Sequence, residues 1–313
     1  MKLRTCLLLL ALGASGCGGA QPSSGPTVIT ISNPANVSNV PLHLAMDKGF
    51  FAAEGLQVKA DVDLGSGSTV ESVVGGQVDM AWSNLVSSLT AYSKGLGVKL
   101  VAITDTAVSG SQQVLVGKDS TARSLADLKG KKLAVLSPAT VCILNVRSAL
   151  KAQGLPVDLI QFTPVAPPEH ANVLEGGEVA ATCTSDPFRS LMIEKLGARS
   201  IYDTSSGELQ GYAVGGYIVS AEFAQKNAKA LAGFQRALLK ATQYANAHPD
   251  EVRTSLPKFT TIKAEIAGKV IINKYLETAD VTALKPEVQR IADAMQAYGL
   301  ADKPINLSGY FLN

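Results

Sequence analysis

Short polar turns that follow predicted strands hold the residues most able to do chemistry. One such turn follows the predicted strand 28–31, and another follows the predicted strand 78–82. A helix that starts directly after a turn has unpaired N–H groups and a partial positive charge, so it can hold an oxyanion or a polar ring without a cationic side chain. This is the chemistry of binding, not of bond cleavage. The candidate ligand-binding residues are Asn33, Asn36, Asn39, Gly67, Ser68, Thr69, Trp82, Ser83, Asn84, Ser137, Thr140, Thr184, Asp186 and Tyr217.

Each candidate also has a structural alternative. Ser, Asn and Asp cap helices in most α/β proteins, so Asp186 is either a cap or an acceptor for a ligand amine or hydroxyl. Trp82, the single tryptophan, either lines a ligand site or covers the core. Tyr212 and Tyr217 either close over the site or pack in a sheet, and we expect His170 to be solvated.

Motifs for catalysis or cofactor binding are missing from the sequence. It contains no Gly-x-Ser-x-Gly, no Cys-x-x-Cys, no phosphate-binding Gly-x-x-x-x-Gly-Lys-Ser/Thr and no histidine pair at metal-ligand spacing. We therefore predict no catalytic residues, no metal site, no cofactor and no enzymatic activity.

The elements that position the polar turns alternate between strand and helix from Thr27 onward. Short β-branched runs followed by helical patterns predict an α/β fold with mostly parallel sheets flanked by helices. In such sheets the ligand lies beyond the carboxyl ends of the strands, where loops and helix starts converge. The part after Ala221 is predicted to be mostly helical, with helices over residues 224–247, 262–278 and 286–298.

Length and charge restrict the function further. The chain has 313 residues, of which 46% are hydrophobic, so it can fill the cores of two domains. Its formal net charge is only +2 and it has no run of basic residues, so we expect no nucleic-acid partner. We expect a monomer.

The N-terminal region predicts export. Residues 1–16 have two basic residues and then an apolar run too short to span a membrane, which is typical of a signal peptide. The stretch Ala14–Cys17 resembles a bacterial lipobox, so we expect lipidation at Cys17, and residues 17–26 read as a flexible tether. The protein is thus expected to be exported and lipid-anchored to a bacterial membrane, on its periplasmic or outer cell-surface side.

Three motifs, in this order, carry a family resemblance. They are AMDKGFFAAEGLQV at residues 45–58, GQVD at residues 76–79 and LADLKGKK at residues 125–132. Together they resemble the substrate-binding proteins of ABC importers for nitrate, sulfonate and taurine. The resemblance implies a two-lobed periplasmic-binding-protein-like (type II) fold with a ligand cleft between the lobes. It also implies an ABC permease with its ATPase as partner, and hinges near residues 105–109 and 221–227.

On this reading, lobe I comprises residues 27–107 plus 223–313, and lobe II comprises residues 108–222. The predicted function is capture of a small polar molecule, a sulfonate, nitrate-like or other small anion, for delivery to the permease. One alternative is a neutral heteroaromatic such as a vitamin or pyrimidine precursor, although the chain lacks the cysteine-rich motif of thiamine-pyrimidine relatives. Another is a sensory lipoprotein that docks on a signalling receptor.

Two cysteines remain after removal of the signal peptide and lipidation of Cys17. Cys142 is predicted in the first turn of a helix and Cys183 at the end of a neighbouring strand, and an exported compartment is oxidising. The pair either forms a disulfide that makes the lobe II wall of the cleft rigid, or remains as two buried thiols.

Overall fold

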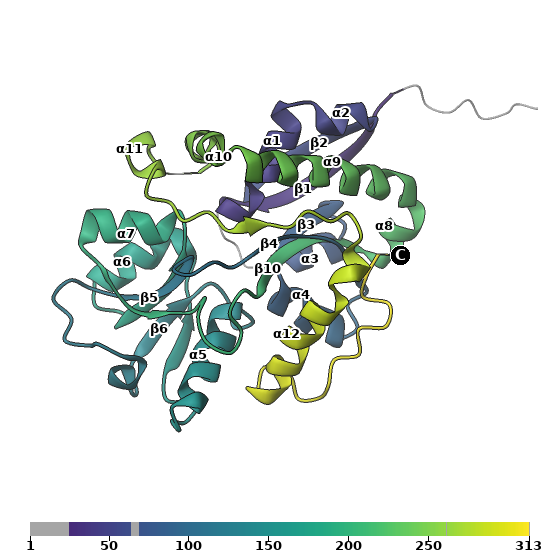
Figure 1. Ribbon diagram of the computed structural model, residues 1–313. Coiled ribbons are helices and arrows are strands. Elements are labelled where there is room, and N and C mark those ends of the chain that lie inside the picture. The colour runs from purple at the N-terminus through teal and green to yellow at the C-terminus, as the bar shows by residue number, and fades with distance from the viewer. Residues whose placement is uncertain (1–24, 64–68, 261, 313) are drawn as a thin grey trace, which may run out of the picture.

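The structure, a computed structural model, describes residues 25–63, 69–260 and 262–312. These residues form two bodies, each built on its own sheet (Figure 1). We call the body around the six-stranded sheet lobe I and the body around the five-stranded sheet lobe II. The two-lobed α/β architecture expected from the sequence is observed. Cys17, Gly67 and Ser68, which the sequence analysis singled out, lie outside the described residues.

The sheet of lobe I has the strand order β11-β4-β10-β3-β1-β2. It is mixed instead of mostly parallel: β1 is parallel to β2 and β3, whereas β10 is antiparallel to β3 and β4. The reason is that β4 leads the chain out to lobe II and β10 brings it back, so the two must run in opposite directions. The strands are β1 (Thr27–Pro34), β2 (Leu56–Asp63), β3 (Met80–Asn84), β4 (Val98–Thr106), β10 (Ala213–Ser220) and β11 (Lys274–Tyr275).

Helices cover both faces of this sheet. Period-two alternation in β3 sends Met80 and Trp82 to one face and Ala81 to the other. On the first face Phe51 stacks on Phe234 with ring centroids 5.2 Å apart, and burial of such a side chain contributes roughly 2 kcal/mol. The first face is covered by α1 (Val40–Asp47), α2 (Phe50–Ala53) and α9 (Ala228–Ala247), and the second by α3 (Thr69–Val74), α4 (Leu85–Ser93) and α12 (Lys285–Ala297).

The three motifs of the sequence analysis shape turns. The first motif includes the end of α1 and the whole of α2, and Gly49 between them has φ 71°, a left-handed conformation that ends α1 before α2 begins. Asp79 accepts hydrogen bonds from the Thr30 N–H at 2.8 Å and the Thr30 hydroxyl at 2.7 Å, which ties the start of β3 to β1. Ser124 and Asp127 form a capping box ahead of β6.

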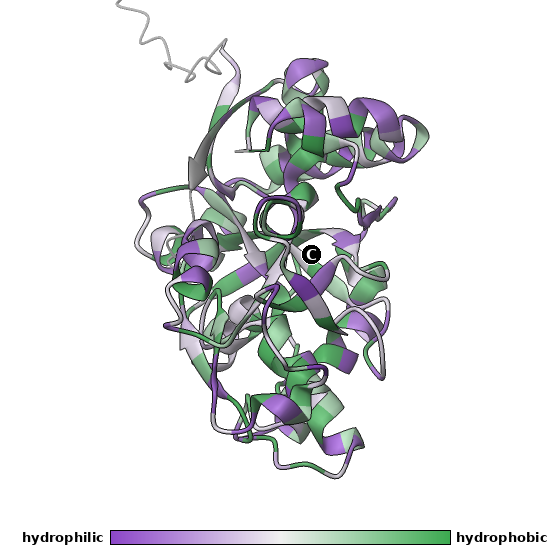
Figure 2. Ribbon diagram, turned by 90° about the vertical axis from the view of Figure 1, so that its left-hand side faces the viewer, coloured by the Kyte–Doolittle hydropathy of each residue, from purple (hydrophilic) through white to green (hydrophobic). Residues whose placement is uncertain are grey.

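Lobe II is built on a mixed sheet with the order β7-β6-β8-β5-β9. Helix α5 packs on one face, and α6 with α7 cover the other. Figure 2 shows hydrophilic and hydrophobic residues side by side along the outer helices of the protein, as expected for helices with one buried face. The elements are β5 (Gln112–Val116), η2 (Leu125–Leu128), β6 (Lys132–Val135), α5 (Val141–Ala152), β7 (Gln161–Pro164), η3 (Pro167–Glu169), α6 (His170–Glu175), β8 (Ala181–Ser185), α7 (Phe188–Leu196) and β9 (Arg199–Asp203).

The two crossings between the sheets correct the predicted boundaries. The first, between β4 and β5, lies where it was expected. The second lies between β9 and β10, at residues 204–212, not at residues 221–227. Strand β10 therefore belongs to the sheet of lobe I, although the prediction placed residues 213–222 in lobe II. The prediction missed β9, a half-buried edge strand, and so misplaced the return of the chain.

The C-terminal part is less helical than predicted. Residues 262–278 form a single short helix, α11, then a segment without regular secondary structure and the edge strand β11, instead of one long helix. The backbone N–H of Ile271 in this segment donates to Asp186 of lobe II at 2.8 Å, so the segment lies against both lobes. The remaining elements are α8 (Ala221–Lys226), α10 (Pro249–Ser255), η1 (Val37–Asn39), η4 (Leu256–Lys258), α11 (Ala264–Ala267) and η5 (Val281–Leu284).

Candidate functional site

A cavity lies between the two lobes, beyond the ends of strands from both sheets. The cavity has a volume of about 130 Å³, enough for a small organic molecule. Side chains from both lobes and from both crossings form its wall. They are Pro34, Ala35, Asn36, Val37, Ser38, Trp82, Asn84, Ser111, Gln112, Leu136, Thr140, Val141, Cys142, Pro167, Pro168, Cys183, Thr184, Ser185, Asp186, Phe188, Tyr212, Val214 and Asn273.

A single buried carboxylate organises the lobe I wall. Asp105, at 0% exposure, accepts hydrogen bonds from the Ser38 hydroxyl at 2.7 Å, the Thr104 hydroxyl at 2.7 Å and the Asn273 amide at 2.5 Å. The Thr104 oxygen in turn accepts the Trp82 Nε1–H at 3.1 Å. Burial raises the pKa of Asp105, and the three donors partly oppose that shift. The Asp105 carboxylate thus orients three cavity-lining residues: Ser38 and Asn273 directly, and Trp82 through Thr104.

Trp82 lies at the border between the core of lobe I and the cavity. It is 6% exposed and packs in the core, yet it also lines the cavity. The neighbouring strand can approach the indole because it carries glycine: a Cβ on Gly215 would lie 2.5 Å from Trp82 Cζ2. Tyr212 from the second crossing and Phe188 from α7 also reach the cavity, so aromatic surface is available from three elements.

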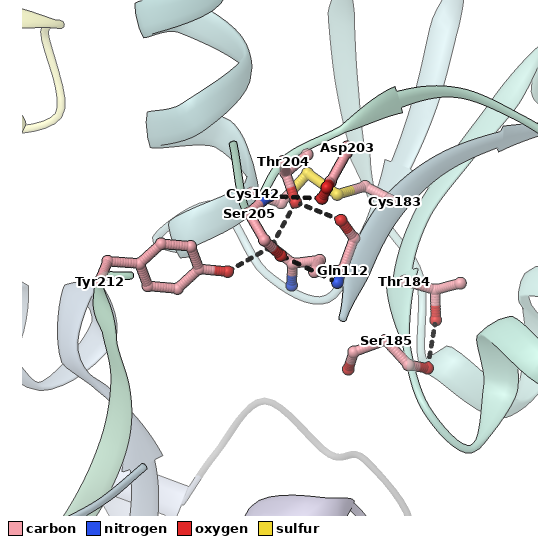
Figure 3. Close-up of a disulfide and its surroundings, with 9 residues drawn as sticks. All are labelled: Gln112, Cys142, Cys183, Thr184, Ser185, Asp203, Thr204, Ser205 and Tyr212. Atoms are coloured by element: carbon pink, nitrogen blue, oxygen red, sulfur yellow. Dashed lines mark hydrogen bonds between the residues drawn. A yellow bond between two sulfur atoms is a disulfide. The ribbon is translucent and has the colours of Figure 1, made fainter. Parts of the chain in front are cut away.

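The lobe II wall contains a disulfide. Cys142 and Cys183 are joined in the structure, with an S–S distance of 2.01 Å, and both line the cavity (Figure 3). The bond connects the start of α5 to β8, as the strand order β6-β8 allows. The cysteines of this wall therefore hold each other and present no free thiol to the cavity.

Asp186 is a structural carboxylate of the same wall. Its Oδ2 accepts hydrogen bonds from Arg189 and from the Ile271 N–H, and its Oδ1 accepts the Ser190 N–H at 3.0 Å. Asp186 is 1% exposed and Arg189 is 7% exposed. Of the two interpretations of Asp186, the structure shows capping of α7 together with a buried ion pair.

The crossings meet in a small polar cluster. The Gln112 Oε1 accepts hydrogen bonds from the Thr204 hydroxyl at 3.1 Å and the Tyr212 hydroxyl at 3.3 Å. Figure 3 shows the Tyr212 ring pointing toward Gln112. Ser111 in the first crossing and Ser205 in the second share a hydrogen bond of 3.0 Å. Because its oxygen is engaged, Gln112 has its amide N–H groups left as donors at the edge of the cavity.

The charge of the cavity wall is unusual for an anion site. Within the part of the chain that the structure describes, Asp186 is the one charged residue among the lining side chains. Arg189 and Arg147 do not line it: Arg189 pairs with Asp186, and Arg147 donates to the carbonyls of Tyr298 and Gly299. Positive potential comes instead from helix starts, above all that of α5, where Thr140, Val141 and Cys142 all border the cavity.

The structure brings some of the predicted residues together and separates others. Asn36, Trp82, Asn84, Thr140, Thr184 and Asp186 line the cavity. Asn33, Asn39 and Tyr217 lie behind its wall, because Asn33 bonds to His43 and Asn39 bonds to Tyr217 inside lobe I. Ser83 and Ser137 bond to nearby backbone carbonyls. The predicted residues outside the lining are Asn33, Asn39, Thr69, Ser83, Ser137 and Tyr217.

Sequence reasoning missed other lining residues. Ser38 lies in a 3-10 helix that was not predicted, and Ser111 and Gln112 lie at the first crossing. Asn273 was assigned to a helix that does not form. A signal for Asn273 was present in the sequence, since the β-branched residues Val270, Ile271 and Ile272 precede it and favour an extended chain.

His170 is buried, although the sequence analysis expected it to be solvated. It is 1% exposed, since α6 packs it against the backbone carbonyl of Val165 at 3.1 Å. Burial lowers the pKa of His170 to about 4, and burial likewise lowers the pKa of His43 to about 4. His43 stacks on Phe259 and does not line the cavity. Among residues 25–63, 69–260 and 262–312, no cluster of His, Cys, Asp and Glu has the makings of a metal site.

In the described ranges, no helix has both the length and the apolar character needed to cross a membrane.

Known proteins are similar to this chain in sequence and in fold. A family model described as "NMT1/THI5 like" matches residues 36–252. The Bacillus subtilis (strain 168) protein named "Putative aliphatic sulfonates-binding protein" is 24% identical over 271 residues, which cover 85% of this chain and 79% of that protein. The alkanesulfonate-binding protein SsuA from Xanthomonas axonopodis pv. citri, solved with MOPS bound, superposes with a TM-score of 0.77 at 18% identity, covering 92% of this chain and 99% of that one.

The same fold also occurs in an enzyme. The desulfurization enzyme DSZB superposes with a TM-score of 0.64 at 19% identity, covering 91% of this chain and 96% of that chain. At these identities the structural likeness establishes the architecture alone. Assignment of a ligand must therefore rest on the cavity.

Proposed function

This chain belongs to the NMT1/THI5-like family, and we propose that it is the solute-binding component of an ABC importer, without catalytic activity. Its relatives among sulfonate-binding proteins support a solute-binding role. The observation that carries the proposal is a cavity whose wall comes from both lobes and from the crossings between them. A solute in such a cavity contacts both lobes only when they are closed, so binding shifts the protein toward the closed form that a permease recognises.

An organic sulfonate is the first candidate for the solute. The start of α5 offers unpaired N–H groups and a partial positive charge to the sulfonate oxygens. The aromatic and aliphatic lining would hold the organic part of the molecule. The names of the relatives support this choice.

A neutral heteroaromatic molecule is the second candidate. It is favoured by the cavity's own charge, because no Lys, Arg or His stands among the lining residues of the described chain and Asp186 brings a carboxylate. Trp82, Tyr212 and Phe188 provide surfaces on which a ring can stack.

Export and anchoring complete the proposal. The basic and apolar pattern of residues 1–16 supports cleavage before Cys17, and a lipid on that residue would hold the protein at the membrane beside its permease. Metabolic labelling with a fatty acid tests this step: wild-type protein should incorporate the label, and a Cys17→Ala variant should not.

The ligand is tested in two stages. Mass spectrometry of small molecules released from gently purified protein shows what the cavity holds. Calorimetric titration with MOPS, an alkanesulfonate and uncharged aromatic amides then measures the affinities, and small-angle scattering of the same samples should show compaction on binding. Absence of binding to every member of both chemical classes, or binding without compaction, would reject the proposal.

A further inference from the structure

Asn273 carries a buried acceptor that the protein does not satisfy. This side chain is 8% exposed and lines the cavity. Its Nδ2 donates to Asp105, but its Oδ1 has no hydrogen-bond partner among the described residues. A buried polar atom without a partner is rare and costly, so its presence at a cavity wall calls for a ligand group that completes it.

The orientation of the Asn273 amide is fixed by chemistry. The Asp105 carboxylate has no N–H and, when ionised, can only accept hydrogen bonds. It therefore selects the Nδ2 side of Asn273 and turns the oxygen away. The other two donors on the carboxylate, Ser38 and Thr104, leave no group there that could pair with an amide oxygen.

The backbone around Asn273 is also held in place. Two residues earlier, the N–H of Ile271 donates to Asp186 of lobe II at 2.8 Å, and one residue later β11 joins the sheet of lobe I. Asn273 thus stands on a segment fixed at both lobes. The Oδ1 atom of Asn36, in the same lobe I wall, is a second buried acceptor without a hydrogen-bond partner among the described residues.

We propose that Asn273 is a specificity-determining residue whose Oδ1 accepts a hydrogen bond from an N–H or O–H group of the bound solute, with Asp105 as the positioning residue that presents this oxygen. This inference rests on the proposed function. It defines the solute more narrowly: whether sulfonate or neutral, the molecule carries a donor on the side that faces lobe I. Molecules of the same shape that have a methyl group there leave the acceptor unpaired and bind more weakly.

Two matched pairs of probes test the inference by calorimetric titration. The first pair is 4-aminobenzenesulfonate and 4-methylbenzenesulfonate, and the second is 4-aminobenzamide and 4-methylbenzamide. In each pair one member has an N–H donor where the other has a methyl group of similar size. In at least one pair, wild-type protein should bind the amino compound about tenfold more tightly than its methyl partner.

Three variants assign the preference to residues. Asn273→Leu should reduce the ratio of the two dissociation constants to near one. Asp105→Asn should give an intermediate ratio, because an amide at residue 105 can offer either a donor or an acceptor and so releases the orientation of Asn273. Asn145→Leu is the matched control, since Asn145 is 2% exposed, has no partner for its own amide among the described residues and does not line the cavity. It should keep the wild-type ratio.

The outcomes separate the inference from the proposed function. Equal affinity of wild-type protein for the two members of every pair that binds would overturn the inference and leave the solute-binding function standing. An unchanged ratio in Asn273→Leu would do the same, and an unchanged ratio in Asp105→Asn would remove the positioning role alone. If none of the four probes bound at millimolar concentration, the ligand classes under Proposed function and this inference would fall together.

Discussion

The two walls of the cavity are held in place by different chemistry. The lobe I wall depends on hydrogen bonds that converge on Asp105, and the lobe II wall on the disulfide between Cys142 and Cys183 and on the Asp186–Arg189 ion pair. A disulfide constrains the unfolded chain and so adds stability, whereas a buried carboxylate costs desolvation and gives orientation. The comparison shows that the two walls are held by different means: covalent and ionic links in lobe II, and hydrogen bonds to one buried carboxylate in lobe I.

Removal of the disulfide should have the largest effect on stability. The bond closes a loop with a sequence separation of 41 residues, so the Cys142→Ser and Cys183→Ser double variant should lose about 4 kcal/mol in the chain-entropy estimate. Urea unfolding measures the loss. Wild-type protein in reductant should behave like the variant, and reductant should leave the variant unchanged. A stability difference below 1 kcal/mol would contradict the stabilising role of the bond.

Loss of the buried ion pair should rank second. In Arg189→Met the Asp186 carboxylate keeps its backbone donors but loses its cation, and we expect a loss of about 3 kcal/mol in the free energy of unfolding. The matched control is Lys226→Met, which breaks an ion pair whose side chains are 67% and 74% exposed. That control should change stability by less than about 0.5 kcal/mol. Equal losses in both variants would show that burial of the pair does not matter.

A smaller loss is expected from the lobe I network. Thr104→Val keeps the shape of the side chain but removes the acceptor of Trp82 Nε1–H and one donor to Asp105, which should cost about 2 kcal/mol. Since Trp82 is the single tryptophan, its emission reports this wall directly, and it should shift in Thr104→Val. Thr104→Ser retains the hydroxyl and should resemble wild type in both measurements. Unchanged emission in Thr104→Val would argue against the network.

Patterns in the sequence were sufficient for the parts of the fold that local physics decides. Alternation of strands and helices predicted the α/β class, and the family resemblance implied the two lobes. The pattern could not give the place of β10, because which sheet a strand joins depends on pairing partners distant in the sequence. Residues 262–278 were predicted as one helix from local periodicity, but tertiary contacts of Ile271 and Asn273 hold the part between α11 and β11 in a non-helical conformation.

The candidate site, like the fold, could be predicted only in part from the sequence. The rule that ligands lie beyond strand ends found Asn36, Trp82 and Asn84, since position along the chain suffices for that rule. The same rule also selected Tyr217, which the structure places in the core of lobe I. The alternation of side chains along a strand does not show which face of the sheet borders the cavity. Asn273 could not be found this way, since it enters the site from a C-terminal segment that follows no predicted strand.

The two lobes have one property in common, a largely buried histidine that should make each lobe less stable in acid. Each lobe has one histidine whose pKa is lowered to about 4 by burial: His43 in lobe I and His170 in lobe II. The unfolded chain binds a proton at each histidine below pH 6.5 and the folded chain does so only near pH 4, so stability must fall as the pH falls through this window. Between pH 6 and pH 5 each histidine should contribute a loss of about 1 kcal/mol. Urea unfolding at the two pH values should show a loss smaller by that amount in His43→Gln and in His170→Gln. A variant with the full wild-type loss would show that its histidine is already charged in the folded protein.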